Sequence, residues 1–403
     1  MKNFMVFLLA VLLFSCVENN GVKKLEIGTY RGYLVAQDHQ EMPFIFEVIS
    51  EHKLNIYNAE EVIEVDEIEY VNDSVYIKLP YFETLIAAKF EGNNFKGQWI
   101  EEDRDRSVAI VAEYNKTQRF AETKTENAID VSGVWEVAFN DYGRRYPSKG
   151  VFEQEGNIVT GTFRTPSGDY RFLEGVVDAD TLKISTFDGA HAFLFKAHVS
   201  DSTMLGDFYS GNHSKETFVA KRNANFELPD ANTLTFINEG YDTFNFSFPD
   251  IEGNMVSFTD QRFKNKVVLV QLMGSYCPNC LDESKFYSKF YEANKDKGLE
   301  IIALAFENAK TKAKAIKGIK RMKARVGMNY PILLAQIGTN DKGKAQEKMP
   351  MLNKVLSYPT TIFIDKKGLV RKIHTGFNGP ATGEKYISFK KEFTEFIDTL
   401  LAE

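Results

Sequence analysis

The hydrophobic pattern changes once along the chain, between residues 223 and 243, and this change separates two kinds of fold. Before it, short runs rich in aromatic and β-branched residues alternate with turn signals, as in FIFEVI, SVYIKL and DTLKIST, which predicts strands. After it, apolar strand-like runs alternate with amphipathic helical segments, which predicts a parallel-centred α/β sheet. Because single cores rarely exceed about 250–300 residues, a chain of 403 residues favours several domains. We expect a multidomain protein in which all-β modules precede an α/β domain.

The β-rich part contains a weak internal repeat. A GTY segment at Gly28 opens one unit, and a GVW segment at Gly133 opens the next, about 105 residues later. The stretch from Val71 also aligns with the stretch from Val177, since each has strand, turn, strand, turn and strand in that order. We expect a tandem repeat of two modules, each a sandwich or a barrel without open edges. Chance likeness between two β meanders is the alternative. The expected boundaries are 1–16 for a signal peptide, 17–24 for a tether, 25–125 and 130–222 for the two modules, 223–243 for a linker and 244–403 for the α/β domain.

The first sixteen residues, MKNFMVFLLAVLLFSC, have the features of an export signal. One Lys precedes an apolar run that is too short for an ordinary membrane span. The end of this run resembles a bacterial lipobox, which predicts that Cys16 is acylated and anchors the protein to a membrane surface. A plain secretory signal is the alternative. We therefore expect a lipid-anchored protein of the bacterial cell envelope that faces the periplasm.

Charge is unevenly distributed along the chain. The formal net charge of -7 argues against nucleic acid as a partner. Residues 59–69 are acidic, whereas the predicted helix at 310–325 carries eight basic residues and no acidic one. We expect this helix to present a solvated basic face. Docking on an anionic surface or on the protein's own acidic N-terminal module is the alternative.

Two of the three cysteines lie in GSYCPNC, between a continuous apolar strand and a helix. Cys277 is expected at the N-cap and Pro278 at the first helical position, which suits proline. Free backbone N–H groups and the helix dipole would lower the pKa of Cys277 and make it a nucleophile. Cys280, one turn later, is positioned to attack the resulting mixed disulfide. If Cys16 carries lipid, this pair is the only thiol pair of the mature chain. One pair is too few cysteines to form a structural disulfide framework in a protein of this size.

Other interpretations of the cysteine pair agree less well with the sequence. A zinc site needs about four N or S ligands, and the α/β region offers only His374 beside the two cysteines. Two inert buried thiols would be unusual at a strand-to-helix CPNC segment. We therefore expect no metal, and the absence of a nicotinamide or flavin fingerprint predicts no cofactor.

The segment VVLVQLMGSYCPNCLDE, followed by SYPTTIFIDKKGLVRKIHTG, is similar to the thioredoxin superfamily, and within it to the membrane-tethered TlpA/ResA-type disulfide reductases of the bacterial envelope. The resemblance covers residues 244–403. It implies a thioredoxin-like fold and a redox disulfide between Cys277, which attacks, and Cys280, which resolves. It also implies disulfide-containing exported proteins as substrates and an upstream dithiol as electron donor.

Further site residues follow from this resemblance. Pro359 matches the family's cis-proline, with a strand-edge proline as the alternative. Glu283 matches an acidic residue that would relay the proton of Cys280, with an ordinary exposed helix glutamate as the alternative. The residues expected to contact substrate are Tyr276, Pro278, Tyr358 and Thr360. The departures from the family pattern are Tyr276 for Trp, Leu281 for Arg and Lys285 for Pro, and they bear on the redox potential and the partner.

Three other functions remain as alternatives. A peroxiredoxin would need Thr where Gly274 stands and Pro where Val270 stands. A Sco-like copper carrier would need one more residue between the cysteines, although His374 follows at a suggestive distance. In an envelope binding lipoprotein, the β modules would capture a ligand through turns such as 187–191 and 208–213. These turns also fit ordinary hairpin ends with core aromatic residues.

Overall fold

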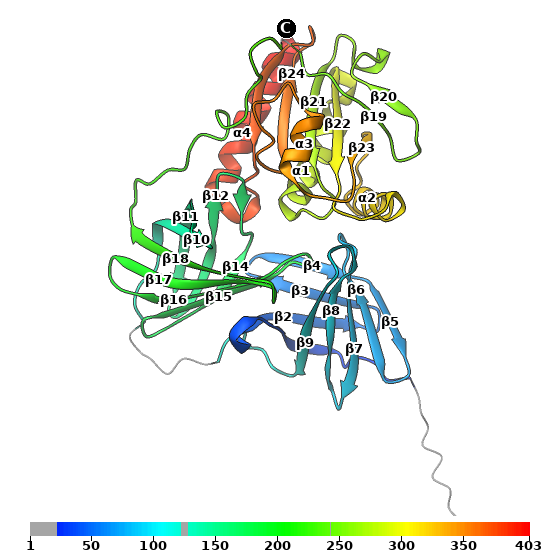
Figure 1. The fold of residues 1–403 in the computed structure, drawn as a ribbon. Helices are drawn as coiled ribbons and strands as arrows, with labels where there is room; N and C mark the ends of the chain where they lie inside the picture. The colour runs from blue at the N-terminus through cyan, green and yellow to red at the C-terminus, as the bar shows by residue number, and fades with distance from the viewer. Residues whose placement is uncertain (1–21, 122–127, 242) are drawn as a thin grey trace, which may run out of the picture.

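A computed structural model of the protein describes residues 22–121, 128–241 and 243–403. The predicted signal peptide, the predicted lipidation site Cys16 and residues 17–21 lie outside these ranges. Two β units lie next to each other, and the α/β domain lies across both of them (Figure 1). Within the described ranges, no helix is both long enough and apolar enough to cross a membrane.

The first β unit is one antiparallel sheet of nine strands. Their spatial order is β4-β3-β2-β1-β9-β8-β7-β6-β5, so the last strand pairs with the first. Burial alternates along these strands, as the period of two in the sequence predicts. The strands are β1 (Gly28–Val35), β2 (Glu41–Ser50), β3 (Lys53–Asn58), β4 (Glu61–Val65), β5 (Glu67–Val71), β6 (Ser74–Lys78), β7 (Thr84–Glu91), β8 (Asn94–Glu101) and β9 (Arg106–Tyr114).

The second β unit is a closed barrel. Its order is β11-β10-β18-β17-β16-β15-β14-β12, and β11 also pairs with β12, which completes the ring and removes the open edges. Phenylalanine rings fill its interior, among them the closely packed Phe163 and Phe195. The strands are β10 (Gly133–Asp141), β11 (Arg144–Glu155), β12 (Ile158–Thr165), β13 (Gly168–Asp169), β14 (Leu173–Asp178), β15 (Thr181–Phe187), β16 (Ala192–Val199), β17 (Thr203–Ser210) and β18 (Ser214–Arg222).

The two β units share one topology. In each, a meander returns so that its last strand pairs with its first, β9 with β1 and β18 with β10. The stretches that align in sequence fall on corresponding strands, since Val71 ends β5 and Val177 lies near the end of β14. Gly28 and Gly133 both start their units at positive φ, which an L side chain rarely adopts. The all-β prediction is confirmed, and the shared topology agrees with a tandem repeat.

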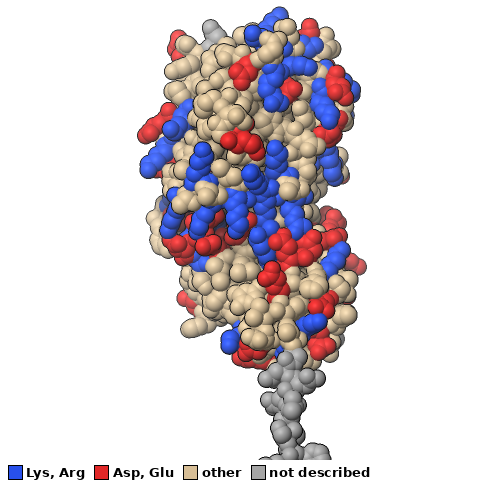
Figure 2. All heavy atoms as spheres, turned by 90° about the vertical axis from the view of Figure 1, so that its right-hand side faces the viewer, with Lys and Arg blue, Asp and Glu red and all other residues tan. Residues whose placement is uncertain are grey.

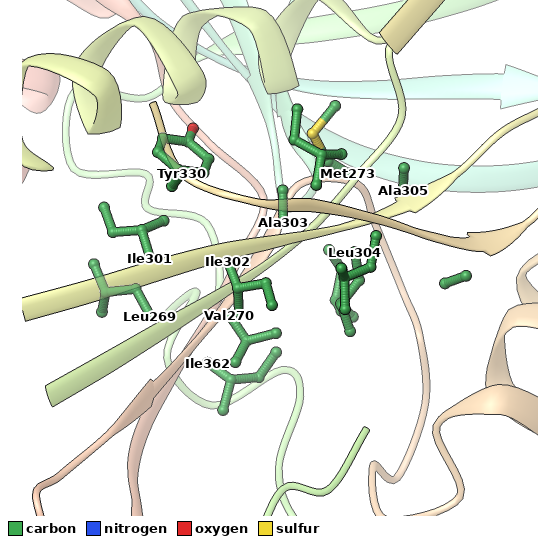
Figure 3. Close-up of a cluster of buried hydrophobic side chains, with 14 of the residues drawn as sticks. Leu269, Val270, Met273, Ile301, Ile302, Ala303, Leu304, Ala305, Tyr330 and Ile362 are labelled. Atoms are coloured by element: carbon green, nitrogen blue, oxygen red, sulfur yellow. The ribbon is translucent and has the colours of Figure 1, made fainter. Parts of the chain in front are cut away.

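The C-terminal domain has a mixed five-stranded sheet in the order β23-β22-β21-β24-β25. The central strand β21 pairs in parallel with β22 and antiparallel with β24, and all its residues are buried. Figure 3 shows the apolar side chains that these strands pack together. The predicted thioredoxin-like α/β fold is confirmed. The strands are β21 (Val267–Met273), β22 (Leu299–Phe306), β23 (Ile332–Gln336), β24 (Thr360–Ile364) and β25 (Val370–Thr375), with a separate hairpin of β19 (Ser247–Pro249) and β20 (Met255–Ser257). The helices are α1 (Pro278–Asn294), α2 (Lys312–Val326), α3 (Lys342–Lys348) and α4 (Glu384–Ala402).

The basic helix α2 docks on the first β unit, so the expectation of a solvated basic face is wrong. Arg321 donates to the backbone carbonyl of Leu79 at 2.6 Å and pairs with Glu67 at 2.7 Å. Arg325 pairs with Asp66 at 2.6 Å. Figure 2 shows the resulting band of Lys and Arg on the α/β domain above a band of Asp and Glu on the β unit. The acidic segment around the β4–β5 turn is therefore one partner of this helix, and carboxylates at positions 83, 102 and 105 of the same β unit pair with lysines nearer its N-terminus.

Candidate active site

Cys277 lies where the buried strand β21 ends and helix α1 begins. Its sulfur is the N-cap acceptor of the helix, because the backbone N–H of Cys280 donates to Cys277 Sγ at 3.3 Å. Pro278 is the first helical residue, as its fixed φ predicts. Both cysteines are free thiols. Cys277 is half-buried, whereas Cys280 is fully buried, so only the first sulfur is open to an incoming molecule.

The surroundings separate the pKa values of the two thiols. Burial alone would raise the pKa of Cys277, but hydrogen bonds from the Cys280 side chain and backbone, and the positive charge of Lys342, lower it below the ordinary value. Burial, together with the adjacent Cys277, raises the pKa of Cys280 well above the ordinary value. One cysteine is therefore favoured as a thiolate and the other as a thiol, which is the asymmetry that a CxxC redox pair requires.

Lys342 is a site residue that the sequence did not single out. It begins α3, and its ammonium group lies 3.0 Å from the centre of the Tyr358 ring, beside the cysteines. Burial lowers the pKa of Lys342 to about 8, so it still carries charge at neutral pH. A lysine in a stretch that is already rich in lysine offers no sequence signal, and only the fold brings it near Cys277.

The Tyr358–Pro359 peptide bond is cis, as the sequence predicts. Cys277 Sγ donates to the carbonyl oxygen of Tyr358 at 3.5 Å, so this loop lies directly against the nucleophile. The Tyr358 ring is buried and stacks on Phe306. The Thr360 side chain is 1% exposed, and its hydroxyl donates to the carbonyl oxygen of Ser357 at 2.9 Å. The side chains of Tyr358 and Thr360 are therefore not available to a substrate. The backbone of this loop is what lies next to Cys277.

Glu283 is fully buried in a polar cluster beneath the cysteines. It accepts hydrogen bonds from Gln271 at 2.8 Å, from Thr361 at 3.0 Å and from Tyr287 at 3.2 Å. Burial raises the pKa of Glu283 to about 7, against the effect of these hydrogen bonds. It is therefore no ordinary exposed glutamate. One sequence signal could have indicated this cluster, because Gln271 is the only polar residue in the apolar run of β21.

Hydrogen bonds also fix the residues that precede the CPNC turn. Glu307, at the end of β22, accepts from the Ser275 backbone at 2.8 Å and from the Ser275 hydroxyl at 2.7 Å. Burial raises the pKa of Glu307 to about 7. Tyr276, which replaces the family's Trp, has its ring 5.4 Å from the guanidinium of Arg104 in the first β unit. The Tyr276 hydroxyl is buried without a hydrogen-bond partner among the described residues.

The second β unit contacts the two residues between the cysteines. The side-chain amide of Asn279 donates to the backbone carbonyl of Asp169 at 3.2 Å and accepts from its N–H at 3.1 Å. The guanidinium of Arg171 donates to the Pro278 carbonyl at 3.3 Å. Gly168 is required here, because a Cβ at its φ of +147° would lie 1.8 Å from the end of the Asn279 amide. A loop of the β barrel thus lies on the CPNC turn.

Arg171 connects the two β units and the α/β domain through ion pairs next to the cysteines. It forms ion pairs with Asp282 of α1, with Glu61 of the first β unit and, at 3.3 Å, with Asp188 of its own unit. Burial disfavours its charge, but these carboxylates raise the pKa of Arg171 well above its ordinary value. Removing these carboxylates would leave an unpaired buried charge, which would destabilise the folded protein. No sequence pattern indicates this cluster, since its members are far apart along the chain.

His374 does not join the cysteines. Its ring contacts the Asn232 side chain at 3.0 Å and Phe389, and it lines a different cavity from Cys277. Burial lowers the pKa of His374 to about 4. Within the described ranges, no group of three or more His, Cys, Asp or Glu side chains is arranged to hold a metal ion.

A family model and curated relatives both match the C-terminal domain. The AhpC/TSA family model matches residues 240–373. The thiol-disulfide oxidoreductase ResA of Halalkalibacterium halodurans is 32% identical over 142 residues, which cover 34% of this chain and 68% of that protein. The thioredoxin-like protein YneN of Bacillus subtilis is 29% identical over 140 residues, which cover 35% and 73% of the two chains. The solved structure of a putative protein disulfide isomerase from Bacteroides thetaiotaomicron aligns over 43% of this chain and 95% of its own, with 17% identity and a TM-score of 0.32.

Proposed function

This chain belongs to the ResA family of thiol-disulfide oxidoreductases, and from this premise we propose that its Cys277–Cys280 dithiol reduces disulfides of exported proteins at the bacterial cell envelope. The observation that carries the proposal is the asymmetry of the pair. Cys277 is accessible and accepts a hydrogen bond from Cys280, whereas Cys280 is fully buried behind it. Such a pair attacks with one sulfur and resolves with the other.

In the first step, the Cys277 thiolate attacks one sulfur of the substrate disulfide. The substrate S–S bond breaks, a mixed disulfide to Cys277 forms, and the departing substrate thiolate takes a proton from solvent. The helix N-terminus and Lys342 support this step, because both favour the thiolate that must attack. The backbone beside Pro359 is the proposed pairing edge for an extended substrate segment.

In the second step, Cys280 must lose its proton before it can attack. Glu283 is the proposed acceptor, since it is buried in the same region and its pKa of about 7 allows it to exchange a proton near neutral pH. The Cys280 thiolate then attacks Cys277 Sγ, the mixed disulfide breaks, and the second substrate thiolate leaves and takes a proton from solvent, while Glu283 releases the proton of Cys280 to solvent. The substrate has gained two electrons and two protons, and the protein holds a Cys277–Cys280 disulfide. An external dithiol restores the reduced pair by the same exchange in reverse.

The test is reduction of bis(2-hydroxyethyl) disulfide, with dithiothreitol as the external dithiol. We expect turnover with the wild-type chain, and with Cys277→Ser a rate no higher than that of dithiothreitol alone. Equal rates for the two proteins would show that the pair is not the reducing group. Thr217→Ala, at an exposed position of β18, serves as the control for handling and should keep the wild-type rate.

Membrane anchoring through Cys16 is a separate part of the proposal. The sequence resemblance to a lipobox supports it, and an acylated N-terminus would keep the active site near the membrane surface. Mass spectrometry of the N-terminal peptide after expression in a bacterial host should find Cys16 as a modified first residue. An unmodified N-terminus at another position would identify a plain secretory signal.

A further inference from the structure

A cavity of about 500 Å³ lies between the second β unit and the CPNC turn. Cys277 is in its wall, together with Pro278, Asn279 and Leu356 of the α/β domain. The opposite wall comes from the barrel, where β11, the loop around β13 and the start of β16 line the cavity. In Figure 1 this is the region where β11 and β12 approach the α/β domain. The reactive sulfur therefore opens into a space between two domains.

The barrel wall is held in place by several specific contacts. Ser357, two residues before Pro359, donates through its hydroxyl to the Ser167 carbonyl at 3.1 Å. The Gly379 backbone N–H donates to the Asp169 carboxylate at 2.5 Å. Together with the contacts between Asp169 and Asn279, these bonds attach one barrel loop to three separate segments of the α/β domain. The cavity is thus a feature of the docked molecule rather than a gap between loosely arranged domains.

The barrel side of this cavity carries an apolar patch next to polar and charged side chains, which are Asp141, Arg144, Thr165, Ser167, Asp169, Arg171 and His191. The Tyr146 and Tyr170 hydroxyls bond to each other at 3.0 Å, and Tyr146 also donates to Glu216 at 2.6 Å. Because these hydroxyls already have hydrogen-bond partners, the two tyrosines contribute mainly their rings to the cavity lining. Pro147 is exposed, and Phe193 packs against the edge of the Tyr170 ring. Leu356 adds an apolar side chain from the opposite wall.

The position and the volume of this cavity limit which substrate segments can reach Cys277. Because Cys277 Sγ must reach the substrate sulfur, the residues next to the substrate cysteine have to lie within this cavity. Its volume is in the range of small-ligand pockets, about 300–1,000 Å³, which accommodates a short extended segment but not a folded domain. A large apolar side chain beside the cysteine would cover the apolar patch formed by Tyr146, Pro147 and Leu356.

We infer that the barrel forms a substrate pocket with the thioredoxin-like domain, and that this pocket selects extended segments with an aromatic or large aliphatic residue next to the disulfide-bonded cysteine. The inference rests on the proposed function, because it assigns the substrate class of the same dithiol. It gives the second β unit a direct role in recognition.

The test compares two symmetrical peptide disulfides, made from Ac-Ser-Phe-Cys-Ser-NH2 and Ac-Ser-Gly-Cys-Ser-NH2. We expect the full chain to reduce the Phe peptide with a kcat/KM at least about tenfold higher, since apolar pockets discriminate by about 10- to 200-fold. Pro147→Asp and Leu356→Asp place a charge on opposite walls and should bring the ratio of the two kcat/KM values close to one. Leu205→Asp changes a 60% exposed residue elsewhere on the barrel and should keep the wild-type ratio.

Equal kcat/KM values for the two peptides in the wild type would overturn the inference, and so would a preference that both pocket variants retain. Either result, with normal reduction of bis(2-hydroxyethyl) disulfide by the wild type, leaves the proposed function intact. Failure of the wild type to reduce that small disulfide would instead overturn the proposed function and the inference with it. Because each variant is judged by a ratio of two substrates, a partial loss of folded protein does not alter the outcome.

Discussion

At Cys277, burial and charge act in opposite directions. Burial disfavours the thiolate, while the Cys280 hydrogen bonds and the Lys342 ammonium favour it, and the balance lowers the pKa of Cys277. Lys342 loses its own charge as the pH rises through about 8. Its support for the thiolate is therefore largely present at neutral pH and is lost in mildly alkaline solution.

Lys342→Met should raise the pKa of Cys277, because it removes a positive charge that favours the thiolate. We expect alkylation of Cys277 by iodoacetamide at pH 7 to slow by about threefold, which corresponds to a loss of roughly 0.7 kcal/mol of charge interaction. The alkylation rate measured against pH gives the shift directly. Lys344→Met, at an exposed position of the same helix, is the control and should leave the pH profile unchanged.

Glu283→Gln should impair the second step of the reaction rather than the first. Glu283 accepts a proton only when it is ionised, so the rate of Cys280 attack should rise as the pH increases through about 7 and then level off. The variant should lose this rise, and its rate should fall by about 100-fold. Stopped-flow release of the second thiol from a preformed mixed disulfide measures the step. Glu292→Gln, exposed on the same helix, should behave as the wild type, and a variant that keeps the midpoint near pH 7 would point to another base.

At the scale of elements, the β12–β13–β14 segment determines what surrounds the CPNC turn. Its Gly168 lies so close to Asn279 that no side chain can be added without movement. Gly156, in the turn between β11 and β12 of the same barrel, also has positive φ, but a Cβ added there would meet no atom within 4 Å. The two glycines share a positive φ, +147° at Gly168 and +62° at Gly156, and differ in their contact with the active site.

Gly168→Ala should displace the barrel loop from the CPNC turn, whereas Gly156→Ala should not. Both substitutions should destabilise the barrel through their positive φ, Gly156→Ala by about 1 kcal/mol and Gly168→Ala by about 1–3 kcal/mol. Only Gly168→Ala should change access to Cys277, with iodoacetamide alkylation at fixed pH at least about twofold faster than in the wild type. Equal alkylation rates in the two variants would mean that the loop does not restrict access to the sulfur.

In the molecule as a whole, the sequence predicted the individual strands and helices but not how the α/β domain docks on the two β units. The strand β21, the start of α1 at Pro278 and the all-β units follow from patterns within short stretches of sequence. The contact of Ser167 with Ser357 joins residues 190 positions apart, and the Arg171 cluster joins three separate bodies. Hydrophobic periodicity does not encode such pairs. The basic helix shows the same limit, because its composition fits a solvated face as well as the docked one that the structure has.

Arg321→Ala should weaken the docking of the α/β domain on the first β unit. It removes hydrogen bonds to the Leu79 carbonyl and the pair with Glu67, which together are expected to stabilise the docked state by about 1–3 kcal/mol. We expect faster proteolysis within residues 223–243 and a smaller effect of salt on that rate, because the interface has lost one ion pair that salt can screen. Lys320→Ala, at an exposed position of the same helix, is the control, and proteolysis that is equally fast in both variants would argue against this contact as a docking bond.

Trapping of the mixed disulfide tests whether Cys277 attacks and Cys280 resolves. The Cys280→Ala variant is mixed with an excess of the Phe-containing peptide disulfide, and the products are separated without reductant and identified by mass spectrometry. We expect a stable mixed disulfide between the peptide and Cys277, and no such adduct on Cys280 in the Cys277→Ala variant. An adduct that accumulates on Cys280, or the absence of one on Cys277, would show that Cys277 is not the attacking sulfur.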